Sequence, residues 1–231
     1  MAQAQKQSQA LKNCISLVLV YKYRRYAIIS CMTDSPSPIT SLLQSQALLR
    51  PGDAVALGYS RMYLAQLAKQ GLVRKIGRGL YATPQRQVSE FSSFAEIASK
   101  QPKALVCLVS ALSFHGLTTQ APHEVWIAIG NKDRIPTKSY PPLRVVRFGG
   151  ETLTEGVASH TMDGVEVKVT NVAKTIADCF KFRNKIGLDI ALEALKAAVQ
   201  SKRVTMDELW HYSQLCRVHN VMRPYLEGLA A

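Results

Sequence analysis

Between residues 59 and 84, the spacing of apolar positions changes from that of a helix to that of two short strands. Residues 60–70 carry apolar side chains at helical intervals, namely Leu64, Leu67 and Ala68. Ser60 is the expected N-cap of this helix, and Gly71 suits its end because glycine readily adopts a positive φ. The pattern predicts a short amphipathic helix that leads directly into β structure.

The β structure predicted after this helix is a tight hairpin. Two apolar segments, Val73–Ile76 and Leu80–Thr83, are typical of short strands, and Gly77-Arg78-Gly79 between them favours a turn. The hairpin is also basic, because it carries Arg74, Lys75 and Arg78.

Two further helices are predicted before this unit. Residues 39–49 form an amphipathic pattern, and Pro51 begins a second helix at Pro51–Leu57, which Gly58 closes. Three helices and a hairpin over residues 38–84 are the elements of a winged helix-turn-helix domain. Such a domain places its third helix in the major groove of DNA and its hairpin on the flanking phosphates.

The charge distribution favours a polyanionic partner. The chain of 231 residues has a formal net charge of +13 and a pI of about 9.7. Residues 50–86 contain seven basic residues and one acidic residue (+6), whereas residues 87–231 contain 17 basic and 14 acidic residues (+3). The positive charge is therefore concentrated where the winged helix is predicted, as in DNA-binding proteins, although a solvated basic face would have the same composition.

A helical projection indicates which side chains would face DNA. Met62, Tyr63, Gln66 and Lys69 lie opposite the buried stripe, although Met62 and Tyr63 could instead pack against the first helix. Gln66 is suited to pair with adenine and Lys69 with guanine. Two residues at the helix start and three in the hairpin are suited to phosphates. The predicted DNA-binding residues are Ser60, Arg61, Met62, Tyr63, Gln66, Lys69, Arg74, Lys75 and Arg78.

After a polar linker at Pro84–Val88, residues 87–231 are predicted to form a larger mixed α/β domain, which makes the overall fold class α+β. A capping box from Ser93 to Glu96 predicts one helix, and the apolar pattern of residues 105–114 predicts another. Four β segments are expected next, with Asp163-Gly164 as the turn between the last two. They are Glu124–Ile129, Leu143–Phe148, Val157–His160 and Val165–Val169.

Three amphipathic helices are predicted to close the larger domain. Val172, Ile176, Cys179 and Phe180 line the first of them, and the second follows from Leu188 to Val199. The third is predicted to begin with a capping box from Thr205 to Glu208 and to extend to Val218.

The first 37 residues differ in composition from the rest and begin with the Gln-rich stretch MAQAQKQSQA. The apolar run Ile15–Val20 is too short to span a bilayer, and no small-residue cleavage site of a secretory signal follows it. Met32 begins a more ordinary start, MTDSPSPIT. We therefore expect residues 1–37 to be a disordered or dispensable leader.

The cysteine pattern predicts neither a zinc site nor a disulfide framework. The five cysteines are widely spaced and odd in number, without a C-x-x-C pair: Cys14, Cys31, Cys107, Cys179 and Cys216. Cys107 and Cys179 lie in apolar patterns and are expected in the core. Histidines likewise lack ligand spacing. These features favour a reduced, cytoplasmic protein without metal or cofactor.

No arrangement typical of an enzyme is apparent. The chain lacks a P-loop, a nucleophile elbow, a dinucleotide-binding glycine motif and the paired aspartates of a nucleotidyltransferase. Ser110 and His115 lie about one helical turn apart without a third orienting group, so they are expected to satisfy a helix end. Lys174 and Asp178 are expected to form an i,i+4 pair on a helix surface. The remaining polar candidates share no recognisable constellation: Asp133, Asp163 and His160.

Four segments resemble the AbiEi family, the antitoxin and transcriptional-regulator components of AbiE-type abortive-infection (type IV toxin–antitoxin) systems. In order they are KIGRGLYATP, SALSFHGLTTQAPHEVWIAI, VKVTNVAKTIADCF and RPYLEGL, and the resemblance spans residues 38–231. Met62 and Gln66 depart from it, because arginines are expected there.

The resemblance implies a winged-helix domain that binds the promoter of its own operon and represses it. It also implies a C-terminal antitoxin domain, residues 87–231, that counteracts a nucleotidyltransferase-like toxin without requiring a stable complex. Two other classes stay open at this point. One is a winged-helix regulator whose larger domain senses a ligand or another partner, and the other is an enzyme, such as a nuclease, that the winged helix targets to DNA.

Overall fold

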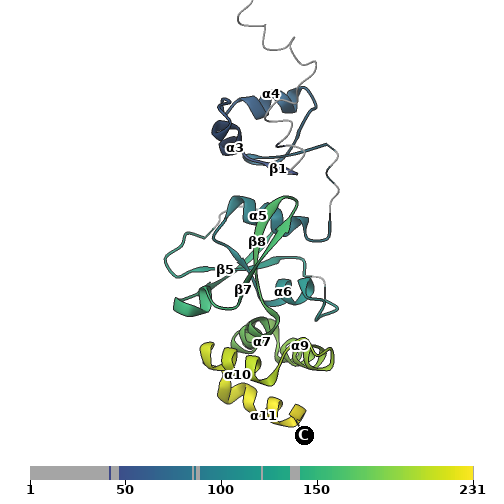
Figure 1. Ribbon diagram of the computed structural model, residues 1–231, viewed down its shortest axis with the longest axis vertical. Coiled ribbons are helices and arrows are strands. Elements are labelled where there is room, and N and C mark those ends of the chain that lie inside the picture. The colour runs from purple at the N-terminus through teal and green to yellow at the C-terminus, as the bar shows by residue number, and fades with distance from the viewer. Residues whose placement is uncertain are drawn as a thin grey trace, which may run out of the picture. The chain divides into compact units, whose positions relative to one another are not determined.

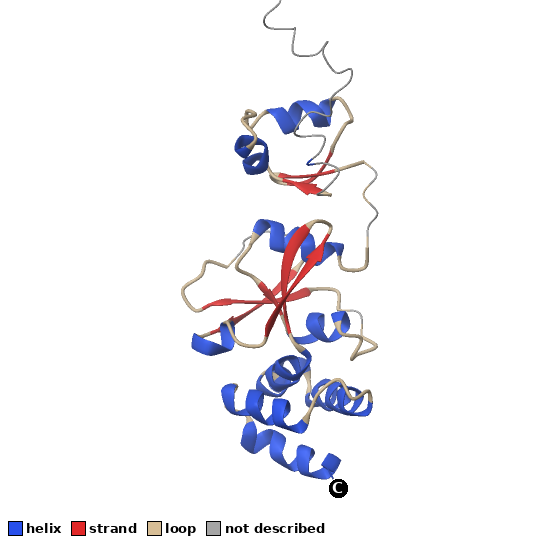
Figure 2. Ribbon diagram, in the orientation of Figure 1, coloured by secondary structure: helices blue, strands red, loops and turns tan. Residues whose placement is uncertain are grey.

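The computed structural model describes residues 42, 47–84, 86, 89–120, 122–135 and 141–230. Leu43–Ala231 forms one compact unit. Its helices and two β-sheets confirm the predicted mixture of α and β structure, as Figure 1 and Figure 2 show. The predicted leader at residues 1–37 and most of the helix predicted at residues 39–49 lie outside the described residues.

Residues 47–84 contain two short helices and a three-stranded antiparallel sheet in the order β1-β3-β2. Their elements are β1 (Leu48–Leu49), α3 (Pro51–Ala56), α4 (Tyr63–Lys69), β2 (Arg74–Gly77) and β3 (Leu80–Ala82). The helix predicted through residue 49 is wrong at its end, because Leu48 and Leu49 pair with β3. Both leucines are buried, which a strand permits by pointing neighbouring side chains to opposite faces.

Helix α4 begins at Tyr63, two residues later than an N-cap at Ser60 predicts. The backbone N–H of Tyr63 donates to the backbone oxygen of Ser60 at 2.9 Å, so residues 60–62 form a turn before the helix. Met62 is the N-cap and no side chain caps this end, so the prediction that Ser60 caps the helix is wrong. The burial of Leu64 and Leu67 is confirmed, and Gly71 has the expected positive φ of 75°.

The larger sheet is mixed and has the strand order β6-β5-β4-β8-β7. Its strands are β4 (Leu105–Val106), β5 (Val125–Gly130), β6 (Leu143–Phe148), β7 (Val157–Met162) and β8 (Val165–Thr170). The helix predicted at residues 105–114 is therefore wrong at its start, since Leu105 and Val106 pair with both β5 and β8. The predicted turn is confirmed, because Asp163 and Gly164 both have positive φ, as a tight hairpin requires.

Helices cover both faces of this sheet. Helix α5 (Ser92–Lys100) packs on one face, and α6 (Leu108–Phe114) and α7 (Val172–Lys181) pack on the other (Figure 1). The capping box predicted at Ser93 is wrong, because the N-cap of α5 is Phe91, two residues earlier, and its side chain makes no capping hydrogen bond. A short 3-10 helix, η1 (Gly150–Leu153), follows β6.

Further helices follow α7 and enclose its outer side. They are α8 (Arg183–Ile186), α9 (Leu188–Gln200), α10 (Met206–Leu215) and α11 (His219–Ala230). The predicted Thr205–Glu208 capping box is confirmed at the start of α10. The third closing helix was predicted to extend to Val218, but it ends at Leu215 because Arg217 adopts a φ of 59° that breaks the helical path.

Candidate nucleic-acid interface

The predicted DNA-binding residues are accessible to solvent, with Tyr63 half-buried and the other eight exposed. Met62 is 68% exposed, so it does not take part in a described core. Tyr63 instead stacks on Tyr59, with ring centroids 4.5 Å apart and an angle of 11° between the planes. Burial raises the pKa of Tyr63, so its hydroxyl stays protonated at neutral pH.

Helix α4 separates an apolar face from a polar face. Leu64 and Leu67 are buried, whereas Gln66 and Lys69 are exposed. Because residues three apart lie on the same side of a helix, Gln66 and Lys69 form a continuous polar surface. This surface can present an amide and an ammonium group to a polyanion.

The hairpin β2–β3 divides its basic residues between two faces and a turn. Arg74 pairs with Ala82 and Lys75 pairs with Tyr81 across the strands. Neighbouring strand residues point to opposite faces, so Arg74 and Lys75 cannot both extend from the same face of the sheet. Arg78 lies exposed in the turn, where Gly79 has a φ of 65°. The sequence alone did not distinguish these three positions.

The segment that carries this surface also has a recognisable relationship to known proteins. Residues 37–84 match the AbiEi antitoxin family of transcriptional regulators. This match confirms the resemblance to the AbiEi family over about a fifth of the chain. The predicted DNA-binding residues lie within the matched range, and their role in binding DNA remains a prediction. No curated protein matches the chain.

Among solved structures, the crystal structure of the RV2827C protein from Mycobacterium tuberculosis is similar to this chain. The sequence identity is 10%, and the similarity covers 78% of this chain and 74% of that chain with a TM-score of 0.47.

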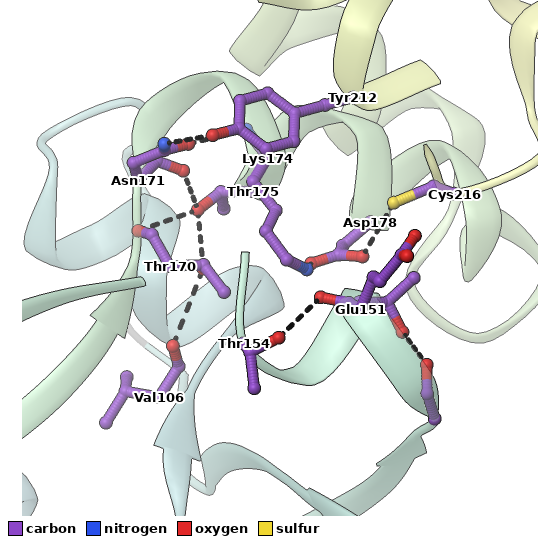
Figure 3. Close-up of polar contacts among 12 residues, drawn as sticks. Val106, Glu151, Thr154, Thr170, Asn171, Lys174, Thr175, Asp178, Tyr212 and Cys216 are labelled. Atoms are coloured by element: carbon purple, nitrogen blue, oxygen red, sulfur yellow. Dashed lines mark hydrogen bonds and ion pairs between the residues drawn. The ribbon is translucent and has the colours of Figure 1, made fainter. Parts of the chain in front are cut away.

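Outside the AbiEi-like segment, Lys174 and Asp178 form a buried ion pair rather than the predicted surface pair (Figure 3). Lys174 Nζ donates to Asp178 Oδ2 at 2.7 Å, and both side chains are completely buried. The Cys216 thiol donates to Asp178 Oδ1 at 3.2 Å, and the Phe148 ring centroid lies 4.5 Å from Lys174 Nζ. The surface prediction is wrong because α7 is covered on every side: by the sheet, by α6 and by the helices that follow it.

The electrostatics of this cluster agree with a structural role. Burial raises the pKa of Asp178, although the neighbouring Lys174 ammonium opposes that effect. Burial, together with the Asp178 charge, raises the pKa of Cys216 to about 12, so the thiol is protonated and weakly nucleophilic near neutral pH. A Cβ atom at Gly156 would lie 2.6 Å from Lys174 Cδ, so the backbone closes tightly over the lysine stem.

Hydrogen bonds continue from this ion pair to the strands and to α10 (Figure 3). Asn171 accepts a hydrogen bond from the Lys174 backbone N–H at 2.8 Å and donates to the Tyr212 hydroxyl at 2.9 Å. The Thr175 hydroxyl donates to the Asn171 backbone oxygen at 2.7 Å. These bonds join the end of β8, the start of α7 and the middle of α10 into one rigid connection.

The other polar candidates of the larger domain are held in separate structural contacts. Ser110 accepts a hydrogen bond from the Trp126 backbone N–H at 2.9 Å, whereas His115 Nε2 lies 2.7 Å from the Thr170 backbone oxygen. They therefore connect α6 to two different strands and do not form a nucleophile–base pair. Asp133 accepts a hydrogen bond from the Gly130 backbone N–H at 3.0 Å.

His160 is half-buried, and Cys107, Cys179 and Cys216 are buried. The His160 ring packs edge-on against Phe114, with centroids 4.8 Å apart. The expected core positions of Cys107 and Cys179 are confirmed, whereas Cys14 and Cys31 lie outside the described residues. Across the part of the chain that the structure describes, no three His, Cys, Asp or Glu residues are grouped to hold a metal ion. Each helix described there is too short or too polar to cross a lipid bilayer.

Sequence reasoning missed the role of Arg86, which it counted only as part of the basic segment. The Arg86 side chain is 2% exposed and forms ion pairs with Glu96 at 2.9 Å and with Asp163 at 2.7 Å. The Asp163 backbone oxygen also accepts a hydrogen bond from Ala47 N–H at 3.2 Å. Arg86 therefore attaches the linker to α5 and to the β7–β8 turn. Its partner Asp163 lies 77 residues away, a separation that no local pattern reveals.

Proposed function

We propose that this chain is a DNA-binding transcriptional regulator and the antitoxin of a type IV toxin–antitoxin system. In this proposal, α4 and the β2–β3 hairpin bind the promoter of the chain's own operon and repress it. The larger domain counteracts a nucleotidyltransferase-like toxin. Both activities are non-catalytic and take place in the cytoplasm.

The observation that carries the proposal is the exposed basic surface of the AbiEi-like segment. Gln66 and Lys69 lie on the solvent side of α4, and Arg61 lies exposed just before that helix. Arg78 adds a positive charge at the hairpin turn. Side chains of this kind contact base edges and phosphates, and no acidic residue occurs between residues 54 and 89 to oppose them.

On DNA, α4 would occupy the major groove with Gln66 toward adenine and Lys69 toward guanine. Met62 is exposed beside them and offers an apolar contact, such as the thymine methyl group. Arg61, Arg78 and one or both of the β2 basic residues would neutralise phosphates. In this arrangement only a few hydrogen bonds recognise the bases of the promoter, so phosphate contacts supply much of the affinity.

We assign the antitoxin activity to the larger domain, which lies outside the family match at residues 37–84, because three of the four segments that resemble the family in sequence lie there. Several basic side chains are exposed there and are available to a toxin, its nucleic-acid substrate or a shared partner: Lys132, Arg134, Lys181 and Lys185. Two other basic residues of α7 and α8 are less accessible. Lys174 is buried, and Arg183 is half-buried and donates to the Phe180 backbone oxygen at 2.9 Å.

A growth-rescue experiment tests whether the two activities are separate. Cells would express the cognate nucleotidyltransferase-like toxin of this proposal together with the full chain or its Arg61→Ala/Gln66→Ala/Lys69→Ala variant. We expect both chains to rescue growth, while only the unchanged chain protects the promoter in a footprint. Lys196→Ala, an exposed position on α9, is the control that should keep both activities. A folded and abundant triple variant that fails to rescue would show that protection acts through DNA.

A further inference from the structure

An apolar groove between α10 and α11 is a feature that neither DNA binding nor the buried ion pair uses. The two helices are neighbours at the C-terminal end of the chain, drawn in yellow in Figure 1. The groove has a volume of about 300 Å³ and is lined by Met206, Asp207, Trp210, Arg223, Leu226 and Glu227. That volume is at the low end for ligand sites, so it fits one or two inserted side chains rather than a large cofactor.

Trp210 is the largest apolar group at this groove. This residue remains 40% exposed, and its ring packs edge-on against His219, with centroids 6.4 Å apart and 71° between the planes. The contact with His219 holds the indole in place and leaves part of it open to a partner. Exposed tryptophans of this kind are frequent anchors of protein–protein interfaces.

The charges at the groove indicate that its occupant carries a basic side chain. Arg223 and Glu227 already pair with each other at 2.7 Å. Asp207 lies in the first turn of α10, where the helix N-terminus partly compensates its charge. It takes part in none of the ion pairs between described residues, so the groove keeps a net negative charge beside the indole. An arginine or lysine side chain satisfies both features, since a cation binds the face of an indole and pairs with a carboxylate.

We propose that the α10–α11 groove docks an amphipathic helix of a partner protein, with a basic side chain of that helix between Trp210 and Asp207. A helix suits the site because two helices already form its walls, and a third can place apolar side chains on Met206 and Leu226. Nucleic acid does not suit it, because Asp207 adds a negative charge to the neutral Arg223–Glu227 pair and the groove as a whole repels phosphate. The site is independent of the proposed DNA binding, and it provides a surface through which a partner protein can act on the chain.

The test uses the full chain and a phage library of 16-residue helical peptides. The most enriched peptides would be synthesised, and their dissociation constants measured by fluorescence anisotropy against the unchanged chain and its variants. We expect the enriched peptides to carry an arginine or lysine next to leucine-like residues. Trp210→Ala should weaken their binding at least about tenfold, Trp210→Phe less, and Asp207→Asn about two- to fivefold.

Two controls make the test specific. Ile135→Ala removes another exposed apolar side chain outside the groove and should leave the dissociation constants unchanged. Replacing the basic residue of a peptide by methionine should weaken binding more than Asp207→Asn does, because it removes the contact with the indole as well as the ion pair. Asp207→Asn should then cause no further loss for the methionine peptide.

The proposal is overturned if no helical peptide is enriched, if the enriched peptides lack a basic residue, or if Trp210→Ala binds them unchanged. It is also overturned if sedimentation shows a dimer that Trp210→Ala dissociates, because a second copy of the chain then occupies the groove.

Discussion

Lys174 Nζ and Asp178 Oδ2 lie 2.7 Å apart in the interior, where neither side chain is exposed to solvent. The pair is placed where α7 meets the sheet and α10, with Cys216 and Phe148 completing its surroundings. A buried ion pair contributes little net stability compared with apolar residues, but each partner depends on the other. We therefore expect the Lys174–Asp178 pair mainly to fix the orientation in which α7 packs.

Removing one partner should destabilise the chain strongly. Lys174→Met leaves the Asp178 carboxylate buried without a counter-ion, and we expect the free energy of unfolding to fall by about 3–5 kcal/mol. Urea unfolding at pH 7 measures the change. The control is Arg223→Ala, which breaks an i,i+4 pair with solvent-exposed side chains and should leave the unfolding midpoint almost unchanged. Equal effects of the two substitutions would contradict the structural role of the buried pair.

His115 should make the fold sensitive to acid. Burial lowers the pKa of His115 in the folded chain from the ordinary value of 6.5, and the nearby Arg203 and His160 add to this effect. As the pH falls, His115 is therefore protonated in the unfolded chain before it is protonated in the folded chain. The stability that neutral His115 contributes is complete above pH 6.5 and is lost as the pH falls through the lower pKa of the folded chain. Between pH 7.5 and pH 5, the melting temperature should decrease less for His115→Gln than for the unchanged chain. An identical decrease in both proteins would exclude His115 as the source.

Arg86 should protect the linker at Pro84–Val88 from proteases. Arg86→Ala leaves the Asp163 and Glu96 carboxylates without their counter-ion, and we expect a loss of about 3 kcal/mol in unfolding free energy. Limited proteolysis of the linker should be faster in this variant than in Arg78→Ala, whose side chain is exposed. Equal cleavage rates would show that the ion pairs do not hold the linker.

The independence of residues 87–231 remains a prediction. The apolar residues Leu48, Leu80 and Ala82 belong to the same core as Phe94 and Ile97 of α5. A fragment that begins at residue 87 lacks Leu48, Leu80 and Ala82, so Phe94 and Ile97 become more exposed in it. We expect that fragment to remain folded, with a lower melting temperature than the full chain, because the core around α7 contains no residue from the first part. A fragment without a cooperative thermal transition would contradict the predicted domain boundary.

Local patterns predicted those elements whose cause is local. Alternating apolar residues gave β6 and β8 within one residue of their bounds, Asp163-Gly164 gave the hairpin turn, and the capping box gave the start of α10. In each case the residues that determine the element lie within a few positions of one another.

The features that sequence reasoning missed depend on distant residues. Leu48–Leu49 and Leu105–Val106 adjoin helices, and only their pairing with other strands makes them β structure. The spacing of Lys174 and Asp178 is the same for a surface pair and a core pair, so burial could not be predicted from it. At the candidate DNA interface, the sequence pattern predicted which residue types are present. It did not predict that Arg74 and Lys75 point to opposite faces of the sheet, because that depends on how β2 pairs with β3.

The central claim, that the basic surface of α4 and the hairpin binds DNA, is tested most directly by the salt dependence of binding. Gel-shift titrations on the promoter of the chain's own operon at several salt concentrations give the slope of log K against log salt. For Arg74→Ala/Lys75→Ala/Arg78→Ala, we predict a slope shallower by about 2 if one strand residue reaches a phosphate and by about 3 if both do. A folded triple variant with the slope of the unchanged chain would contradict the claim.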